Sequence, residues 1–256
     1  MEKINIFNDV ITIISFIMNL TLLLSVAVKI YVYFSKKRYV KKVLGFTKDT
    51  VQISNSTFHL ITDTKSSNDF ITYSSLKSIN NVINLLNIIE KKFDLLNKTT
   101  ETKNEINIGG FITNKKVNAY FTKYFPHFKF IINDKYKEVY DNYSIDKRII
   151  EYSSKTYGFK IVDNFLETDS QLTDYAFLIK LTNSDFKNNK KKTVHILFGG
   201  GDIGTVKATE YLLTHYKEIY KKYKNNHYFF AIKVNRVDES IDYSKGIIDL
   251  TDKMFL

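Results

Sequence analysis

The sequence has no cysteine and no tryptophan, and it holds one proline (Pro126) and nine glycines in 256 residues. Without cysteine the chain forms no disulfide scaffold and no cysteine-ligated zinc site, and its composition suits a reducing compartment. Long linkers and disordered segments are usually rich in proline and glycine, so the scarcity of both indicates a mostly folded chain. A chain of this length has room for one sizeable domain and a smaller appendage.

Several catalytic and metal-binding motifs are missing as well. The chain has no phosphate-binding G-x-x-x-x-G-K-[ST] loop, no G-x-S-x-G nucleophile turn and no H-E-x-x-H zinc helix. Its five histidines show no ligand spacing, and no pair of carboxylates stands out for acid–base chemistry. The sequence therefore predicts no metal and no cofactor, and it identifies no catalytic residue.

Positive charge is concentrated near the N-terminus. Residues 1–49 hold eight lysines and arginines against three acidic residues, a net +5 out of the total of +11. Such an excess beside an apolar segment is more typical of a membrane anchor than of a nucleic-acid-binding face. We therefore expect no direct binding to duplex DNA.

An uncharged run of nineteen residues extends from Val10 to Val28. About 20 apolar residues in a helix are enough to cross the hydrocarbon core of a bilayer. The run is too long for a cleaved signal peptide and lacks a small-residue cleavage site, while a buried core helix is seldom apolar on every face. We expect residues 1–46 to form a retained, single-pass transmembrane anchor with a basic juxtamembrane segment.

The flanks of this run predict its orientation. The basic stretch "SKKRYVKK" (35–42) follows it, whereas Glu2 and Asp9 precede it. By the positive-inside rule the C-terminal part then lies in the cytoplasm, at the inner (plasma) membrane. Near the middle of the run lies Asn19, whose amide is either tolerated in a single helix or pairs with another helix. The second possibility predicts a homo-oligomer.

The remainder of the chain shows alternating strand and helix patterns. Residues 47–103 are predicted to be a connector, with short β-like runs and an amphipathic helix over about 75–97. Within residues 104–256, "YAFLIKL" (175–181) and "TVHILF" (193–198) are mostly apolar without alternation, as in strands buried on both faces. The alternation predicts an α/β fold, a Rossmann-like layered domain with a largely parallel sheet. Ligands of such sheets bind beyond the carboxyl ends of the strands.

The stretch "HILFGGGDIGT" (195–205) places glycines between an apolar strand and a long amphipathic helix. Gly199, Gly201 and Gly204 fit G-x-G-x-x-G, a turn whose backbone N–H groups bind phosphate together with the helix N-terminus. Such turns also occur merely because a helix packs closely on a strand, so two interpretations remain open. Asp238 and Glu239 lie too far along the chain to be the acidic residue expected about 20 residues after the glycines in a dinucleotide-binding fold.

A second glycine turn, "IGGFITN" (108–114), ends another predicted strand, and we expect the two turns to face one another across a crevice. Asn114 either contacts the ligand or caps the following helix, and Asp174 meets either a ribose or neighbouring backbone. Arg148 is a candidate for bidentate phosphate binding. The predicted ligand-binding residues are Gly199, Gly200, Gly201, Asp202, Gly204, Thr205, Gly109, Gly110, Asn114, Asp174 and Arg148.

The strand, "GGGDIGT" and following helix resemble the Rossmann-like nucleotide-sensing domains of the LOG/SLOG group. The similarity to the pattern P-G-G-x-G-T-x-x-E, with one residue inserted, falls on Gly200, Gly201, Gly204 and Thr205. Gly199 stands at the proline position and Ala208 at the glutamate position. In bacterial anti-phage signalling systems such domains can be joined to an N-terminal transmembrane segment and act as effectors. The resemblance implies a nucleotide-derived ligand.

Topology and resemblance together predict a membrane effector whose cytoplasmic domain senses a nucleotide-derived signal and, through oligomerisation, perturbs the membrane in anti-phage defence. A second hypothesis is a membrane-anchored enzyme that hydrolyses or transfers a nucleotide or nucleoside group, with Glu210 or Asp174 as its carboxylate. A third is a structural partner of another membrane protein. The expected partners are the lipid bilayer, a nucleotide-derived small molecule, further copies of the chain and a signal-producing enzyme.

Overall fold

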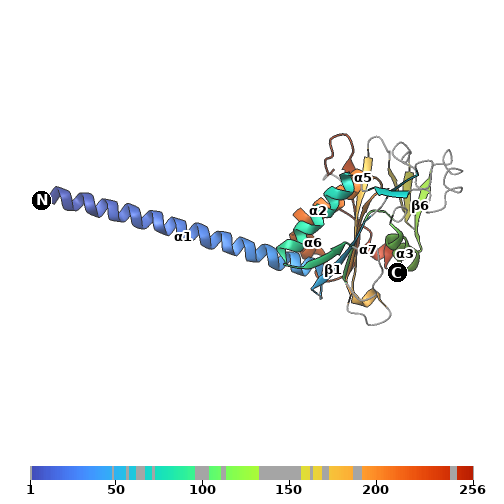
Figure 1. Cartoon of the computed structure of the whole chain (residues 1–256), viewed down its shortest axis with the longest axis horizontal. Coiled ribbons are helices and arrows are strands. Elements are labelled where there is room, and N and C mark those ends of the chain that lie inside the picture. Colours follow the sequence, from blue (N-terminus) through green and yellow to red (C-terminus); the bar gives the residue numbers. More distant parts are fainter. Residues whose placement is uncertain are drawn as a thin grey trace.

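A long helix, α1 (Glu2–Leu44), projects from an α/β domain formed by the following residues (Figure 1). The computed structural model describes residues 2–47, 49–55, 58–61, 67–70, 73–95, 104–110, 114–132, 157–161, 164–168, 173–186, 192–242 and 247–255. The predicted site residue Arg148 lies outside these ranges.

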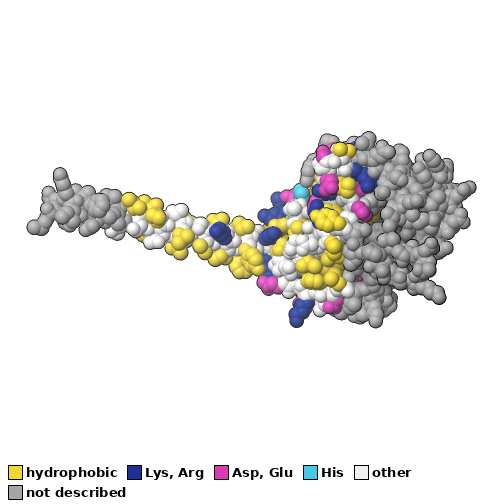
Figure 2. All heavy atoms as spheres, turned by 45° about the horizontal axis from the view of Figure 1, so that its top comes forward, with side chains coloured by type: hydrophobic (Ala, Val, Ile, Leu, Met, Phe, Trp, Pro, Cys, Tyr) yellow, Lys and Arg dark blue, Asp and Glu magenta, His cyan; other side chains and the backbone are white. Residues whose placement is uncertain are grey.

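Helix α1 is long and apolar enough to cross a membrane. Its side chains are exposed all round from Thr12 to Phe34, a length of about 35 Å at the helical rise of about 1.5 Å per residue. Figure 2 shows hydrophobic side chains along this part of α1 and basic ones gathering where it meets the domain. The core helix of a soluble protein would bury these side chains. The predicted N-terminal apolar helix is confirmed, and the side of the membrane that the domain faces stays a prediction.

A seven-stranded mixed sheet forms the centre of the domain. Its strands are β1 (Thr50–Ser54), β4 (Lys92–Leu95), β5 (Asn104–Ile108), β9 (Thr173–Leu181), β10 (Val194–Gly199), β11 (Tyr228–Asn235) and β12 (Ile247–Asp249). They are ordered β12-β11-β9-β10-β5-β1-β4. β4, β1, β5 and β10 are parallel neighbours, β9 is antiparallel to β10 and β11, and β12 is antiparallel to β11. Most strands thus run in one direction, as the sequence predicted.

Smaller elements complete the domain. A hairpin is formed by β2 (Phe58–Ile61) and β3 (Ser67–Phe70), and β6 (Phe128–Ile132), β7 (Tyr157–Ile161) and β8 (Asn164–Thr168) form a three-stranded antiparallel sheet. The other helices are α2 (Tyr73–Ile88), α3 (Lys115–Tyr124), the short 3-10 helix η3 (Asn183–Asp185), α5 (Asp202–Thr214), α6 (Tyr216–Tyr223) and α7 (Thr251–Met254). The long helix predicted after the glycines is divided at His215 into α5 and α6.

The segment predicted to be a connector, residues 47–103, instead supplies strands to the main sheet. β1 lies between β4 and β5, and its residues are buried from Val51 onward. Helix α2 ends at Ile88, earlier than predicted, because the chain turns at Glu90, which has a left-handed φ of 56°, and continues as β4. The boundary predicted at residue 104 therefore separates no two structural units.

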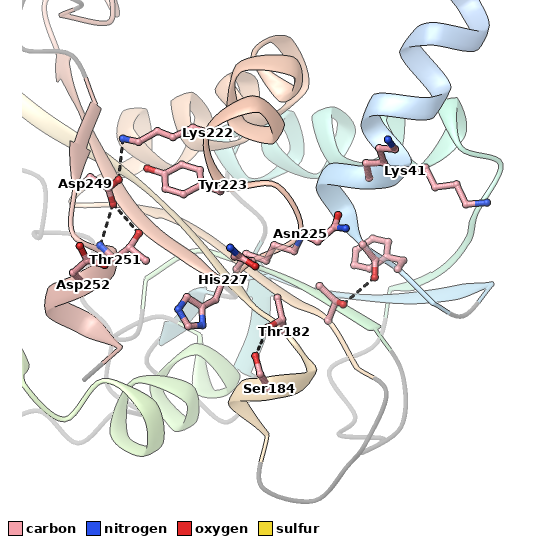
Figure 3. Close-up of a pocket in the computed structure, with 16 residues that line it drawn as sticks. Lys41, Thr182, Ser184, Lys222, Tyr223, Asn225, His227, Asp249, Thr251 and Asp252 are labelled. Atoms are coloured by element: carbon pink, nitrogen blue, oxygen red, sulfur yellow. Dashed lines mark hydrogen bonds and ion pairs between the residues drawn. The ribbon is translucent and has the colours of Figure 1, made fainter.

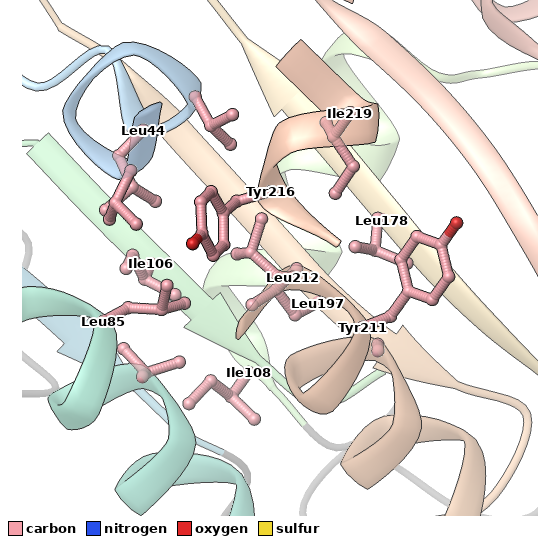
Figure 4. Close-up of a cluster of buried hydrophobic side chains, with 14 of the residues drawn as sticks. Leu44, Leu85, Ile106, Ile108, Leu178, Leu197, Tyr211, Leu212, Tyr216 and Ile219 are labelled. Atoms are coloured by element: carbon pink, nitrogen blue, oxygen red, sulfur yellow. The ribbon is translucent and has the colours of Figure 1, made fainter. Parts of the chain in front are cut away.

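Helices cover both faces of the sheet. α2, α5, α6 and the last turns of α1 pack on one face, and α3 and α7 lie on the other (Figure 1). In Figure 4, Leu44 of α1 and Leu85 of α2 join Tyr216 and Leu212 over the strand residue Ile106. The last turn of α1 (residues 40–44), which we call the root of the helix, is therefore part of the domain's hydrophobic core.

The strand order also locates the edge where a ligand is expected. From β1 the chain passes through α2 to β4 on one side, and it then returns to the other side of β1 to form β5. Such a reversal is a topological switch point, and open α/β sheets bind ligands outside the carboxyl ends of the strands there. In this chain the switch point lies between β1 and β5.

Candidate functional site

Two glycine turns lie side by side at the carboxyl edge of the sheet. Gly109 and Gly110 follow β5, and Gly199 to Gly201 end its parallel neighbour β10. The N–H of Gly109 donates to the carbonyl of Leu197 at 2.9 Å. A Cβ added to Gly110 would stand 4.0 Å from the carbonyl oxygen of Gly199. The structure thus brings together the two turns that the sequence predicted to face one another.

The carboxylate of Asp174 occupies the start of α5. It is fully buried and accepts hydrogen bonds from the N–H groups of Gly201 at 3.0 Å and Gly204 at 2.9 Å, and from Tyr175 at 2.7 Å. Asp174 reaches this place because β9 is antiparallel to β10, which puts the amino end of β9 beside the carboxyl end of β10. A phosphate at a helix N-terminus would use the same N–H groups. The protein's own side chain satisfies them here, so Asp174 meets backbone, one of its two predicted roles.

Asp174 shares this edge with an arginine. Burial raises the pKa of Asp174, while the nearby Arg236 and the backbone N–H groups of Gly204, Tyr175 and Gly201 act to lower it. Arg236 follows β11, whose end pairs with the start of β9. Sequence analysis missed Arg236, since only the pairing of these strands brings it near Asp174.

Close packing explains two glycines of the G-x-G-x-x-G pattern. A Cβ on Gly199 would lie 2.4 Å from the backbone of Gly204 and Thr205, and one on Gly204 would lie 2.5 Å from the carbonyl oxygen of Tyr175. The Thr205 hydroxyl accepts from the Gly199 N–H at 2.9 Å and donates to the Gly201 carbonyl at 3.1 Å. These residues hold the strand, turn and helix together, and their contact with a ligand stays a prediction.

A buried polar cluster lies under α3 at the switch point. The side-chain oxygen of Asn114 caps α3 by accepting from the N–H groups of Lys116 at 3.0 Å and Val117 at 3.4 Å. Its amide nitrogen donates to the Ser54 hydroxyl at 3.1 Å and to the carbonyl of Ile108 at 2.9 Å. Asn114 therefore caps the helix, one of its two predicted roles, and also links β1 to β5.

Glu105 is the anion of this cluster. It accepts from Lys192 at 2.7 Å and from the Tyr120 hydroxyl at 2.9 Å. Asn107, on the same strand, donates to Glu105 at 3.4 Å and accepts from the Ser54 hydroxyl. We call Ser54, Glu105, Asn107, Asn114, Tyr120 and Lys192 the switch-point cluster.

Most residues of the switch-point cluster were not predicted from the sequence. A signal was present, because polar and apolar residues alternate in "TVQIS" and "NEINI", which puts Ser54 and Asn107 on one face of neighbouring strands. A polar face on a buried strand is unusual, and buried polar groups need hydrogen-bond partners. The pairing of these two strands, however, is visible only in the fold.

Two polar groups beside the cluster are buried without a hydrogen-bond partner. They are the ammonium of Lys116 and both amide atoms of Asn55, which directly follows β1; neither has a partner in the part of the chain that the structure describes. Burial lowers the pKa of Lys116, Glu105 acts to raise it, and Lys192 acts to lower it. A buried polar group without a partner costs about 1–3 kcal/mol. These two groups therefore call for a functional explanation.

Other predicted residues lie at the start of α5 or along it. Gly200 donates its N–H to the carbonyl of Tyr175 at 3.1 Å, and Asp202 is exposed in the first turn of α5. Glu210, a carboxylate of the enzyme hypothesis, pairs with Lys207 at 2.8 Å and with Lys77 at 3.0 Å.

No protein-family model, curated protein or solved structure matches the chain. The similarity of residues 199–205 to the LOG/SLOG group therefore stays a prediction. The candidate site is defined by its geometry: the two glycine turns lie at the carboxyl edge of the sheet, and the switch-point cluster extends from this edge along β1 and β5.

At the opposite edge, two side chains of the central strands and that of Thr193, directly before β10, hold the root of α1. Lys180 donates to the carbonyl of Val43 at 2.8 Å, the Nε2 of His195 bonds that of Leu44 at 2.9 Å, and the Thr193 hydroxyl donates to that of Gly45 at 3.0 Å. The last carbonyls of a helix lack partners within the helix, and a cation there is favourable. We call Lys180, Thr193 and His195 the helix socket. It joins α1 to the domain without a flexible linker.

His195 makes the stability of the socket depend on pH. Burial, and to a smaller extent the charge of Lys180, lower the pKa of His195 to about 3, although the bond to Leu44 acts to raise it. An unfolded histidine has a pKa of about 6.5. Between these values the unfolded chain binds a proton that the folded chain does not. The free energy of unfolding should therefore fall as the pH drops from about 6.5 towards about 3, by up to ~1.4 kcal/mol per pH unit.

Urea unfolding of the full chain in detergent, at pH values across this range, measures the effect. His195→Gln keeps a donor for Leu44 but does not titrate, so this variant should lose the corresponding part of the pH dependence. An identical pH dependence in both proteins would contradict the assignment of a neutral His195 to the socket.

Proposed function

We propose that the chain is a membrane effector. α1 crosses the inner membrane, and the cytoplasmic, Rossmann-like domain senses a nucleotide-derived signal that another enzyme makes. Ligand binding changes the association of α1 helices between copies of the chain and so perturbs the membrane, in anti-phage defence. One observation carries this proposal: α1 runs without a break from its exposed apolar part into the hydrophobic core of the domain.

The ligand site of the proposal is the carboxyl edge at the switch point. The turn at Gly110 leaves room for a ligand to approach the backbone closely, and the amide of Asn55, directly after β1, and the ammonium of Lys116, in the first turn of α3, are buried without partners among the described residues. Because Asp174 already neutralises the start of α5, we assign the anionic group of the ligand to the α3 side, near Lys116. A ligand there would recover the hydrogen bonds that these groups lack.

A chain of packed helices connects this edge of the sheet to α1. α5 begins at the glycine turn and packs on α2, where Asn81 donates to Thr209 at 3.1 Å. α6 follows after one residue and contacts α1, with the Tyr220 ring 5.9 Å from that of Tyr39 and 5.1 Å from the ammonium of Lys42. A small shift of α5 on ligand binding would therefore reach the root of α1 through packed, rigid elements.

The charge of the membrane-proximal turns supports a cytoplasmic domain. Lys36, Lys37, Arg38, Lys41 and Lys42 follow the exposed apolar part of α1. Lys37 forms an ion pair with Glu90 of the domain at 2.6 Å, which brings the domain close to the end of the apolar stretch. Basic residues at this position favour retention on the cytoplasmic side.

Calorimetry with a panel of nucleotides and the full chain in detergent tests the ligand site. If Asn55 and Lys116 serve a ligand, Asn55→Ala and Lys116→Met should weaken binding about tenfold or more while leaving the free protein as stable or more stable, since each removes a buried unpartnered group. The exposed Asn84→Ala is the matched control and should change neither. Absence of binding by any nucleotide, or equal binding by all variants, would overturn the ligand site.

Self-association of α1 is expected to depend on Asn19. The hydroxyls of Thr21 and Ser25 bond within the helix, to the carbonyls of Ile17 and Leu22 at 2.7 Å each. No such bond is found for Asn19 in the described part of the chain, so its amide is available to a second helix. Interhelical bonds of this kind contribute about 0.6–2 kcal/mol.

Asn19→Leu should accordingly weaken self-association about threefold to thirtyfold, measured as energy transfer between labelled chains in lipid vesicles. Thr21→Val, which removes a hydroxyl already bonded within its own helix, should leave the transfer unchanged. Equal losses in the two variants would show that Asn19 has no specific part in the association.

A further inference from the structure

A cavity lies at the edge of the sheet opposite the glycine turns, beside the root of α1. It has a volume of about 810 Å³ and is bounded by the last turn of α1, the end of β9, the residues before β10 and β11, and α7 (Figure 3). Small-molecule sites in proteins typically have volumes of about 300–1,000 Å³. The proposed function makes no use of this cavity.

The part of the cavity beside α1 is basic. Lys41 and Lys42 line it from the helix, and Lys180 lines it from β9. Lys180 is 1% exposed, and its ammonium donates to the carbonyl of Val43. An ammonium has three N–H donors, so two remain for a ligand. Among the described residues no carboxylate forms an ion pair with Lys180, and burial lowers its pKa to about 8.

The part of the cavity away from α1 is polar, and its acidic side chains are only partly paired with basic ones among the described residues. The Thr251 hydroxyl donates to Asp249 at 2.7 Å, and Lys222 pairs with Asp249 at 2.9 Å. Thr182 and Asn225 line the space between Asp249 and α1, and Figure 3 shows Asn225 near its middle. Hydroxyls and amides of this kind bind the hydroxyl groups of a sugar or polyol.

We propose that this cavity is a site for a phosphate-bearing polyhydroxy compound. Its phosphate would lie on Lys41, Lys42 and Lys180, and its hydroxyls would lie towards Thr182, Asn225 and Asp249. Because the Lys180 ammonium also holds the carbonyl of Val43, a ligand at this site would act directly on the attachment of the membrane helix. The site goes beyond the proposed function, since it lies at the other edge of the sheet from the glycine turns.

The same chemistry occurs in a free sugar phosphate and in a phospholipid headgroup. The exposed apolar part of α1 ends at Phe34. Lys41 lies seven residues further on, about 10 Å along the helix. A headgroup that extends from the bilayer and a soluble phosphate are both able to reach this distance. The probe experiment therefore uses both sources.

Calorimetry on the full chain in nanodiscs of phosphatidylcholine, titrated with inorganic phosphate and then with ribose phosphate, tests the soluble source. The thermal stability of the chain in discs with and without phosphatidylinositol tests the lipid source. Lys41→Gln, an exposed substitution that leaves the fold intact, and Lys180→Met should each weaken binding about tenfold. Lys221→Gln, an exposed lysine of α6 outside the cavity lining, is the matched control and should bind as the wild type does.

Saturable binding of ribose phosphate that Lys41→Gln weakens would support a soluble ligand, and stabilisation by phosphatidylinositol with the same sensitivity would support a headgroup. No binding of either kind, or binding that Lys41→Gln and Lys221→Gln change equally, would overturn the proposal. Gly110→Ala, at the other edge of the sheet, should leave this binding unchanged. Failure of this site is thereby distinguished from failure of the nucleotide site.

Discussion

Replacing Gly204 by alanine should destabilise the domain by ~3 kcal/mol or more, whereas alanine at Gly110 should change its stability by less than ~1 kcal/mol. The new Cβ at Gly204 would lie 2.5 Å from the carbonyl oxygen of Tyr175 and 2.8 Å from the carboxylate of Asp174. The first of these atoms belongs to the backbone of β9, and the second is held by three N–H groups, so neither moves cheaply. At Gly110 the nearest atom would be 4.0 Å away, an ordinary contact.

Urea unfolding of the full chain in detergent, followed by circular dichroism, measures both variants. Equal stability of Gly204→Ala and the wild type would contradict the close packing of α5 on β9. Gly110→Ala then has a second use: because it should stay folded, any loss of nucleotide binding in this variant reports on the turn as a ligand contact and not on the fold.

Removing the Asp174 carboxylate should destabilise the domain by about 3 kcal/mol and create an anion site. Asp174→Ala leaves the buried N–H groups of Gly201, Gly204 and Tyr175 without their acceptor, and each such group costs about 1–3 kcal/mol unless water enters. The vacated space lies at the N-terminus of α5, where an anion is favoured. Inorganic phosphate or formate should therefore restore part of the lost stability, and increasingly so with concentration.

Asp202→Ala is the matched control for this experiment. Asp202 is exposed in the first turn of the same helix, so its loss should cost less than ~1 kcal/mol and should not be rescued by anions. The comparison is made by thermal unfolding with and without added phosphate or formate. Equal destabilisation in the two variants, or no rescue of Asp174→Ala, would show that the carboxylate is not the group that satisfies the turn.

The strongest periodic signals in the sequence predicted the corresponding elements well. The uncharged run from Val10 to Val28 predicted the apolar part of α1, and the run before Gly199 predicted β10. The turn at Gly109 and Gly110 was placed correctly beside that at Gly199 because both end strands of one sheet. Local patterns were sufficient where one segment alone determines the structure.

The direction of the strands and their long-range pairing could not be predicted from the sequence. The apolar run of β9 reports burial on both faces but not its antiparallel direction, and it is this direction that brings Asp174 to the start of α5. The helix socket was missed for the same reason, since Lys180 and His195 lie on neighbouring strands far along the chain from α1. A lysine inside the apolar run "YAFLIKL" was the available signal, because a buried lysine needs an acceptor.

The direct attachment of α1 to the domain is the central claim, and insertion of a flexible glycine–serine linker between Phe34 and Ser35 tests it most directly. Such a linker keeps the membrane helix and the folded domain but separates their movements. The measurement is the membrane potential of cells that express the intact or the linker-containing chain, with and without phage challenge. We predict depolarisation on challenge with the intact chain and none with the linker, although both chains insert into the membrane and bind the same nucleotide. Equal depolarisation by both chains would contradict transmission through α1.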